Sequence, residues 1–315
     1  MRRRPKVVSK PNPKKVKNLF WIVPLVLVVV MILVYVGISV YGAYAFAQVP
    51  NRITSFKSTP ADYGLTYEEV NFPSAAKDHL TMRGWWIPNP ASDKAIIVVH
   101  GREQSRMERL YLSKDLWNMG YNLLLFDLRG HGASDGNLYF YGQYESWDTV
   151  GAFNFVKNKG LVAENVGLYG VSMGAAASLL ALGHSSEIKT IFSDSSYADF
   201  GQLATERMPV EKGLPAFFLP GIFMAGQILL DFNVAELRPE QVLRTLHDRR
   251  IFLVHSKADA MIPVADFYRL KEAGGNNIVG SWLLEGADHT QGVTLYQQEY
   301  LKQFETFFKA SLGKP

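Results

Sequence analysis

The sequence predicts an α/β fold, in which a mostly parallel central sheet is covered by helices on both faces and preceded by one transmembrane helix. Short, continuously apolar segments such as 95–101 and 122–130 alternate with helical segments such as 106–120 and 144–160, which end in glycine. Unbroken apolar strands that alternate with helices are typical of parallel sheets buried on both faces. A long uncharged stretch near the N-terminus predicts the transmembrane helix.

The composition is that of a globular protein with an unusual distribution of charge. The chain of 315 residues has 48% hydrophobic and 20% charged residues and contains no cysteine, which excludes disulfides, thiolate metal sites and a cysteine nucleophile. Eight of its 33 basic residues fall within residues 1–17, where there is no acidic residue, so the remainder is net negative. We therefore expect no nucleic-acid partner and no metal or organic cofactor.

The N-terminal segment predicts a membrane anchor. Residues 1–17 form a basic tail, and no charged residue occurs from Asn18 to Asn51. About 20 apolar residues suffice to cross a bilayer, so we predict a transmembrane anchor over 18–47. Basic residues favour the cytoplasmic side, so we expect a single-pass protein of the cell membrane whose C-terminal domain lies outside the cytoplasm.

The alternative for this segment is a cleaved signal peptide. Small residues precede Gln48 and resemble a cleavage site, but the apolar run is about twice as long as the apolar region of a signal peptide. We favour the anchor for that reason, and residues 48–64 are then a short linker. A helix buried in a soluble core is the least favoured reading.

The folded domain is predicted over residues 65–315. Residues 65–88 predict two strands joined by a turn, because they are rich in β-forming residues. Further strands are predicted at 95–101, 122–130, 165–172, 188–197, 250–259 and 280–289, and helices at 106–120, 144–160, 173–183 and 294–312. The sheet does not need residues 198–248, which we interpret as a small helical cap insertion.

A serine between two glycines marks the predicted active site. Gly170, Ser172 and Gly174 match G-x-S-x-G, with a strand predicted before the serine and a helix after it. That context is typical of a nucleophile elbow, in which a tight turn exposes the serine at a helix N-terminus. We therefore predict that Ser172 is a nucleophile rather than an ordinary helix cap.

A serine nucleophile needs a base and an acid that orients the base, and in this type of fold both follow the serine in the chain. His289 follows the last predicted strand and is the predicted base, whereas His247 is expected to be solvated and His255 to be structural. Asp259 lies just past a strand end and is the predicted acid. Asp194, at the end of the preceding strand, is the weaker candidate.

The predicted oxyanion hole uses two backbone N–H groups. One belongs to Met173, directly after the nucleophile, and the other to Arg102, in the loop that follows the strand ending at His100 and Gly101. The alternative interpretation of His100 and Gly101 is a tight turn without a catalytic role.

Residues 214–230 of the insertion contain no charge. A second membrane span there would place Ser172 and His289 on opposite sides of the bilayer, so we reject it. We expect the segment to belong to the cap, with some of its apolar side chains lining the approach to Ser172. The candidates are Phe217, Phe218, Phe223, Met224, Ile228 and Leu229.

Five motifs in order resemble the α/β-hydrolase superfamily: VVHGREQSR, LLLFDLRGHGASDG, YGVSMGAAAS, HSKADAMIP and EGADH. They are most similar to its membrane-anchored bacterial serine hydrolases of the Bem46/ABHD13 type, over roughly residues 65–312. The resemblance implies an α/β-hydrolase fold and a structural role for His131. Arg102 and Glu103 depart from the family, which often has small or amide residues after His-Gly.

The predicted function is hydrolysis of an acyl ester or thioester through an acyl-enzyme on Ser172, with a small-molecule or lipid-like ester as substrate. A serine peptidase or amidase on the same fold is the first alternative, although no motif for binding a peptide terminus is visible. A non-catalytic envelope protein that binds a ligand is the second, and the intact Ser172, Asp259 and His289 argue against it. The sequence makes no prediction of the oligomeric state.

Overall fold

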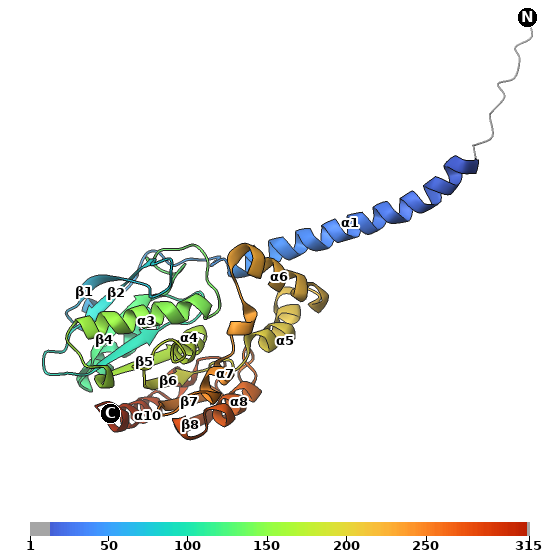
Figure 1. The fold of residues 1–315 in the computed structure, drawn as a ribbon. Helices are drawn as coiled ribbons and strands as arrows, with labels where there is room; N and C mark the ends of the chain where they lie inside the picture. The colour runs from blue at the N-terminus through green and yellow to red at the C-terminus, as the bar shows by residue number, and fades with distance from the viewer. Residues whose placement is uncertain (1–12, 314–315) are drawn as a thin grey trace, which may run out of the picture.

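A computed structural model describes residues 13–313 and contains an eight-stranded sheet (Figure 1). The strands are β1 (Glu68–Pro73), β2 (Thr81–Ile87), β3 (Ala95–Val99), β4 (Asn122–Asp127), β5 (Val166–Val171), β6 (Thr190–Asp194), β7 (Arg250–Ser256) and β8 (Ile278–Leu284). Their order is β1-β2-β4-β3-β5-β6-β7-β8. The β1–β2 and β2–β4 pairs are antiparallel and the remaining pairs are parallel, so the predicted α/β-hydrolase fold is confirmed.

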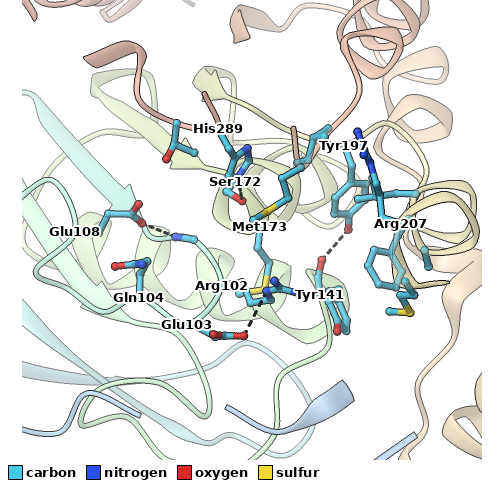
Figure 2. A pocket seen from close by; sticks show the side chains of 18 residues that line it. Arg102, Glu103, Gln104, Glu108, Tyr141, Ser172, Met173, Tyr197, Arg207 and His289 are labelled. Carbon is cyan, nitrogen blue, oxygen red and sulfur yellow. Dashed lines mark hydrogen bonds and ion pairs between the residues drawn. The ribbon is translucent and has the colours of Figure 1, made fainter. Parts of the chain in front are cut away.

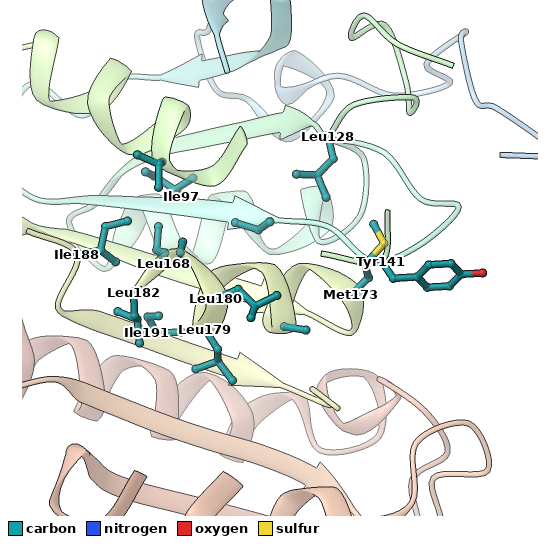
Figure 3. Packing of buried hydrophobic residues seen from close by; sticks show 14 of the residues in the cluster. Ile97, Leu128, Tyr141, Leu168, Met173, Leu179, Leu180, Leu182, Ile188 and Ile191 are labelled. Atoms are coloured by element: carbon teal, nitrogen blue, oxygen red, sulfur yellow. The ribbon is translucent and has the colours of Figure 1, made fainter. Parts of the chain in front are cut away.

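Helices cover both faces of the sheet. On one face lie α3 (Gln143–Asn158), α4 (Met173–Ala181) and α8 (Val264–Gly274), and on the other lie α2 (Ser113–Asn118) and α10 (Gln297–Ser311). Figure 3 shows the first core, where Ile97, Leu168 and Ile191 of the sheet are buried with Leu179 and Leu180 of α4. Each such buried side chain contributes about 1.5–3 kcal/mol to folding. Strands that bury both faces explain the unbroken apolar runs.

Short helices connect these elements. They are η1 (Pro60–Tyr63), η2 (Leu110–Leu112), η3 (Ala163–Asn165), η6 (Gly275–Asn277) and α9 (Gly292–Leu295). The predicted helix 106–120 is wrong in its first half, because α2 begins only at Ser113. Arg106 is almost fully buried, and its backbone N–H and Nε both donate to Asp127, at 2.7 and 2.8 Å. This buried ion pair holds Arg106 in the loop that precedes α2.

The predicted insertion between β6 and β7 forms a series of helices. They are α5 (Phe200–Lys212), η4 (Ala216–Phe218), α6 (Leu219–Leu230), η5 (Val234–Glu236) and α7 (Pro239–Arg244). The first part of this series lies on the side of the domain from which the N-terminal helix emerges (Figure 1). We refer to residues 200–230, which include α5 and α6, as the cap.

The N-terminal helix α1 (Pro13–Ala47) projects away from the domain (Figure 1). Its segment Phe20–Ala47 is long and apolar enough to cross a membrane, and in its 18-residue apolar window the mean hydropathy is 2.9 and only 6% is buried. It is therefore not the core helix of a soluble domain, although a signal sequence has the same properties. Most of the predicted basic tail lies outside the described residues.

Candidate active site

The turn between β5 and α4 holds Ser172 in a strained conformation. Its φ of 54° and ψ of −120° lie in a region that favours glycine, and such strain persists only where the surroundings enforce it. A Cβ on Gly174 would lie 2.2 Å from the carbonyl oxygen of Val99, so only glycine fits behind the serine. The G-x-S-x-G pattern therefore has the steric cause that the sequence indicated.

Three predicted residues from three separate loops meet in one chain of hydrogen bonds. Ser172 Oγ lies 2.8 Å from His289 Nε2, and His289 Nδ1 lies 2.7 Å from Asp259 Oδ2. The other carboxylate oxygen of Asp259 accepts the backbone N–H groups of Met261, at 2.9 Å, and Ile262, at 2.8 Å. The buried Asp259 carboxylate is thus fixed from one side by backbone donors and faces the imidazole with the other.

The alternative acid, Asp194, belongs to a different network. Its carboxylate accepts the hydroxyls of Tyr300, at 2.8 Å, and Ser195, at 2.9 Å, and forms an ion pair with Arg109 at 3.3 Å. Arg109 also donates to the carbonyl of Thr290, next to His289, at 3.1 Å. Asp194 therefore contacts the loop of His289 only through Arg109.

Two further histidines that follow Ser172, His247 and His255, lie where the sequence suggested. His247 is exposed. His255 is buried within β7, and its Nε2 lies 3.0 Å from the carbonyl oxygen of Ile262. Burial lowers the pKa of His255, so a neutral structural side chain fits both its position and its contacts.

The two predicted oxyanion donors belong to backbone segments that adjoin Ser172. Met173 is the first residue of α4. The carbonyl oxygen of Ser172 accepts the N–H groups of Ala175 and Ala176, so the hydrogen bonds of the helix begin after Met173 and its N–H is not used within the helix. The loop Gly101–Gln104, which carries Arg102, adjoins the serine, since a Cβ on Gly101 would lie 3.2 Å from Ser172 Cβ. The arrangement brings both loops to the serine.

Two side chains hold the 101–104 loop in place, and sequence reasoning missed one of them, the half-buried Glu108. Glu108 Oε2 accepts the N–H of Gly101 at 2.6 Å, and burial raises the pKa of this carboxyl. The N–H of Glu103 donates to His131 Nε2 at 3.1 Å. The role of Glu108 could not be predicted from the sequence, because the residue lies within the segment that was predicted to be the helix 106–120.

His100 and His131 are neutral at pH 7, because burial lowers their pKa to about 4 and about 3. His100 Nε2 accepts the N–H of Leu128 at 2.9 Å, and its Nδ1 lies 2.7 Å from the carbonyl of Gly101. His131 Nδ1 similarly lies 2.8 Å from the carbonyl of Arg129. Both rings therefore carry their proton on Nδ1, and His131 has the structural role expected of it.

A cavity of about 290 Å³ lies in front of Ser172 (Figure 2). Loops at the strand ends form one side, which we call the core wall: Gly101–Gln104, Glu108, Ser172, Met173, His289 and Thr290. Helix α5 forms the opposite side, which we call the cap wall: Phe200, Leu203, Ala204, Arg207 and Met208. No cluster of three or more potential metal ligands occurs in the described part of the chain.

The prediction that residues 214–230 line the approach to Ser172 is wrong for the cavity directly in front of the serine. None of the side chains around the cavity comes from that stretch. Instead η4 and α6 pack on α1, where the ring of Tyr35 lies 5.0 Å from Phe217 and 5.4 Å from Phe218. Sequence reasoning treated α1 as an isolated membrane helix, so it assigned this apolar surface to the substrate.

Similar proteins agree with this architecture. A family model described as "Serine aminopeptidase, S33" matches residues 90–201. The uncharacterised protein YqkD of Bacillus subtilis is 27% identical over 231 residues, which cover 72% of this chain and 74% of YqkD. The uncharacterised protein YfhR of Salmonella typhimurium is 28% identical over 272 residues, 81% of this chain and 82% of its own.

Solved structures show the same fold. Esterase Pf2001 of Pyrococcus furiosus superposes with a TM-score of 0.68 at 25% identity, over 84% of this chain and 99% of the esterase. The acylaminoacyl peptidase of Pyrococcus horikoshii superposes with a TM-score of 0.58 at 18% identity, over 79% of this chain and 42% of the peptidase. The sheet order, the family match and these structures show that the chain has the α/β-hydrolase fold.

Proposed function

We propose that the protein is a serine hydrolase that cleaves a carboxylic ester or thioester through an acyl-enzyme on Ser172. The observation that carries this proposal is the hydrogen-bond chain from Ser172 through His289 to Asp259, at the floor of a cavity. No cofactor takes part in the proposed reaction.

In the proposed mechanism Ser172 Oγ attacks the carbonyl carbon while His289 Nε2 takes its proton. Asp259 holds the imidazole in the Nδ1–H tautomer and stabilises the imidazolium. The N–H groups of Met173 and Arg102 stabilise the oxyanion. His289 then protonates the leaving alkoxide or thiolate, and a water activated by the same histidine releases the acid.

An ester fits this cavity better than an unblocked peptide. An aminopeptidase needs a free carboxylate to bind the substrate's ammonium group. The two carboxylates of the core wall already have partners, since Glu108 accepts the N–H of Gly101 and Glu103 forms an ion pair with Arg102 at 3.6 Å. The mostly apolar cap wall favours an acyl chain, at about 0.8 kcal/mol per buried methylene.

We further propose that the chain belongs to the membrane-anchored Bem46/ABHD13-type branch, with α1 as an uncleaved anchor and the hydrolase domain of residues 65–315 outside the cytoplasm. Cleavage before Gln48 would remove the helix on which α6 packs and would uncover Ile222, which is 3% exposed. The N-terminus of the mature protein tests this point: retention of the basic tail is expected, and an N-terminus at Gln48 would contradict it.

The function is tested by turnover of a matched substrate panel. We expect the full-length protein to hydrolyse 4-nitrophenyl esters faster than aminoacyl 4-nitroanilides, and Ser172→Ala to lose ester turnover by about 10⁴-fold or more. Ser193→Ala is the matched control, because Ser193 is buried on the neighbouring strand and its hydroxyl has no hydrogen-bond partner among the described residues. Faster cleavage of the anilides would favour the peptidase alternative.

A further inference from the structure

Except for the exposed Gln227, the helix α6 is apolar on all sides and carries no charge. Its inner face buries Leu219 and Ile222. On its outer face, together with the preceding turn, Phe217, Met224 and Ile228 are 66%, 62% and 73% exposed. A helix that is apolar all round belongs inside a protein core or a membrane, and no described residue covers the outer face of α6.

This helix packs directly on the last turns of α1. The rings of Phe217 and Phe218 contact Tyr35, whose hydroxyl donates to the carbonyl of Phe217 at 3.3 Å. Further along α1, Ile222 lies against Gly42, where a Cβ would approach Ile222 Cδ1 to 2.7 Å. Close contact at a small residue is typical of helices that pack within membranes. The depth of α6 is therefore tied to the depth of α1.

The length of α1 places these contacts at the membrane surface. Its apolar span starts at Phe20, and a hydrocarbon core of about 30 Å takes about 20 residues at about 1.5 Å each. The far boundary of the hydrocarbon then falls near Ser39, between Tyr35 and Gly42. Tyr41 and Tyr44 come directly after it and are 75% and 40% exposed, as expected for aromatic side chains at the lipid–water interface.

We propose that α6 and the turn before it dock on the outer leaflet beside α1, with Phe217 in the hydrocarbon and Met224, Ile228 and Leu229 at the level of the lipid headgroups, and that the cavity at Ser172 takes a lipid acyl ester from that leaflet. The proposal rests on the proposed hydrolase function and names its substrate class. A helix that lies in the interface buries its apolar face about 5–10 Å deep, which agrees with the contact between Phe217 and Tyr35, a few residues inside the boundary.

An apolar seam joins this membrane contact to the active site. A second, smaller cavity lies where α1 meets α6, and its lining includes Phe46 and Phe223. Tyr141 and Met208 line both this cavity and the one at Ser172. The second space is about 10 Å³, and in the proposed route the flexible side chain of Met208, which belongs to the cap wall, rotates to open it toward the first. An acyl chain that enters from the leaflet thus has an apolar route toward the serine.

The depth of α6 is measured with single cysteines, which are unique because the chain has none. Met224→Cys and Ile228→Cys carry an NBD fluorophore in the full-length protein, reconstituted in phosphatidylcholine–phosphatidylglycerol vesicles. Val279→Cys on β8 is the matched control, since Val279 is apolar and 55% exposed. Brominated phosphatidylcholine should quench the probes at 224 and 228 at least threefold more than the probe at 279, and aqueous iodide should do the reverse.

Equal iodide quenching at all three positions overturns the proposal. Disulfide-linked dimers formed through unlabelled Met224→Cys, with no quenching by brominated lipid, overturn it in favour of a second copy covering α6. None of these readouts requires catalysis. They are therefore independent of the proposed function, which fails separately if Ser172→Ala retains ester turnover.

The substrate class is tested with a surface variant of α6. Met224→Gln/Ile228→Gln should lower kcat/KM for 4-nitrophenyl palmitate in vesicles by tenfold or more, and leave kcat/KM for soluble 4-nitrophenyl acetate within twofold. Val279→Gln should change neither value. An unchanged ratio of palmitate to acetate turnover in the double variant contradicts delivery of the substrate from the leaflet.

Discussion

The two walls of the cavity differ in how their groups are held. On the core wall, side chains fix the backbone, as Glu108 does for Gly101 and His131 does for Glu103. The cap wall is a single face of α5, and its Arg207 has a buried Nε without a hydrogen-bond partner among the described residues. The loops of the core wall are anchored at the ends of the sheet strands. The cap wall is instead followed in the chain by α6, which packs on α1.

This contrast indicates that the core wall carries out the proposed reaction and that the cap wall determines which acyl chains are accepted. The proposed reaction needs atoms placed to within fractions of an ångström, and the core wall is built from groups with little freedom to move. Acyl-chain choice needs only apolar space, which the cap wall supplies. Mutations of the core wall should therefore change kcat, and mutations of the cap wall should change the substrate profile.

The largest expected effect separates the two candidate acids of the core wall. Asp259→Asn should lower kcat by about 10⁴-fold, because an amide no longer fixes the Nδ1–H tautomer of His289. Asp194→Asn should lower kcat of the folded enzyme by no more than about tenfold, but should reduce the free energy of unfolding by about 3–5 kcal/mol, since it leaves the buried Arg109 without its carboxylate. Steady-state kinetics and denaturant unfolding of both variants measure this, and the reverse ranking of kcat would assign the acid to Asp194.

A smaller effect is expected at Glu108. Glu108→Ala leaves the N–H of Gly101 without its acceptor, which costs about 1–3 kcal/mol, so kcat should fall about 10–100-fold with little change in KM. Glu108→Gln keeps an acceptor oxygen and should restore most of the activity. A loss in KM alone, or equal losses in both variants, would show that Glu108 does not act by positioning the loop.

Acid should loosen the core wall through His131. Its pKa is about 3 in the folded chain and about 6.5 when unfolded, so between these values the unfolded state binds more protons and stability falls as pH falls. At pH 5 the loss is about 2 kcal/mol. Denaturant unfolding at pH 7 and pH 5 should therefore show a smaller pH dependence for His131→Gln than for the wild type. Glu145 and Asp266, whose pKa values burial raises to about 7 and about 6, titrate equally in both proteins. Parallel pH dependences would contradict the assignment.

The smallest expected effect is on the cap wall. Met208→Ala should open space beside the cavity and shift the preference toward longer acyl chains, by up to about fourfold in kcat/KM for each further methylene that is buried. Val210→Ala, on the outside of the same helix where Val210 is 79% exposed, is the control and should leave the profile unchanged. A series of 4-nitrophenyl esters from acetate to octanoate measures both, and identical profiles would remove Met208 from the acyl site.

The residues of the core wall could be predicted from the sequence, because a serine nucleophile requires particular residue types at fixed places in the chain. A serine at positive φ needs small neighbours, and a fixed chain order led from Ser172 to Asp259 and His289, which the structure brings together. The sheet was equally readable, because strands buried on both faces are continuously apolar. The roles of Glu108 and Arg106 could not be predicted from the sequence, because each depends on a partner that only folding brings near.

The cap was misread for a different reason. An apolar stretch does not specify which apolar partner it contacts. The sequence of residues 214–230 was equally compatible with lining a substrate cavity and with packing against another helix. The structure resolves the choice through Tyr35 and Gly42, which come from a segment far away in the chain. The residues that do line the cavity, such as Phe200 and Met208, lie in α5, where polar neighbours gave no pattern to single them out.

The identity of the nucleophile is tested most directly by covalent labelling with a fluorophosphonate, followed by proteolysis and mass spectrometry of the modified peptide. The adduct is expected on Ser172 alone, with none on Ser172→Ala and normal labelling of Ser193→Ala. An adduct on another residue, or undiminished labelling of Ser172→Ala, would contradict the assignment of Ser172 as the nucleophile.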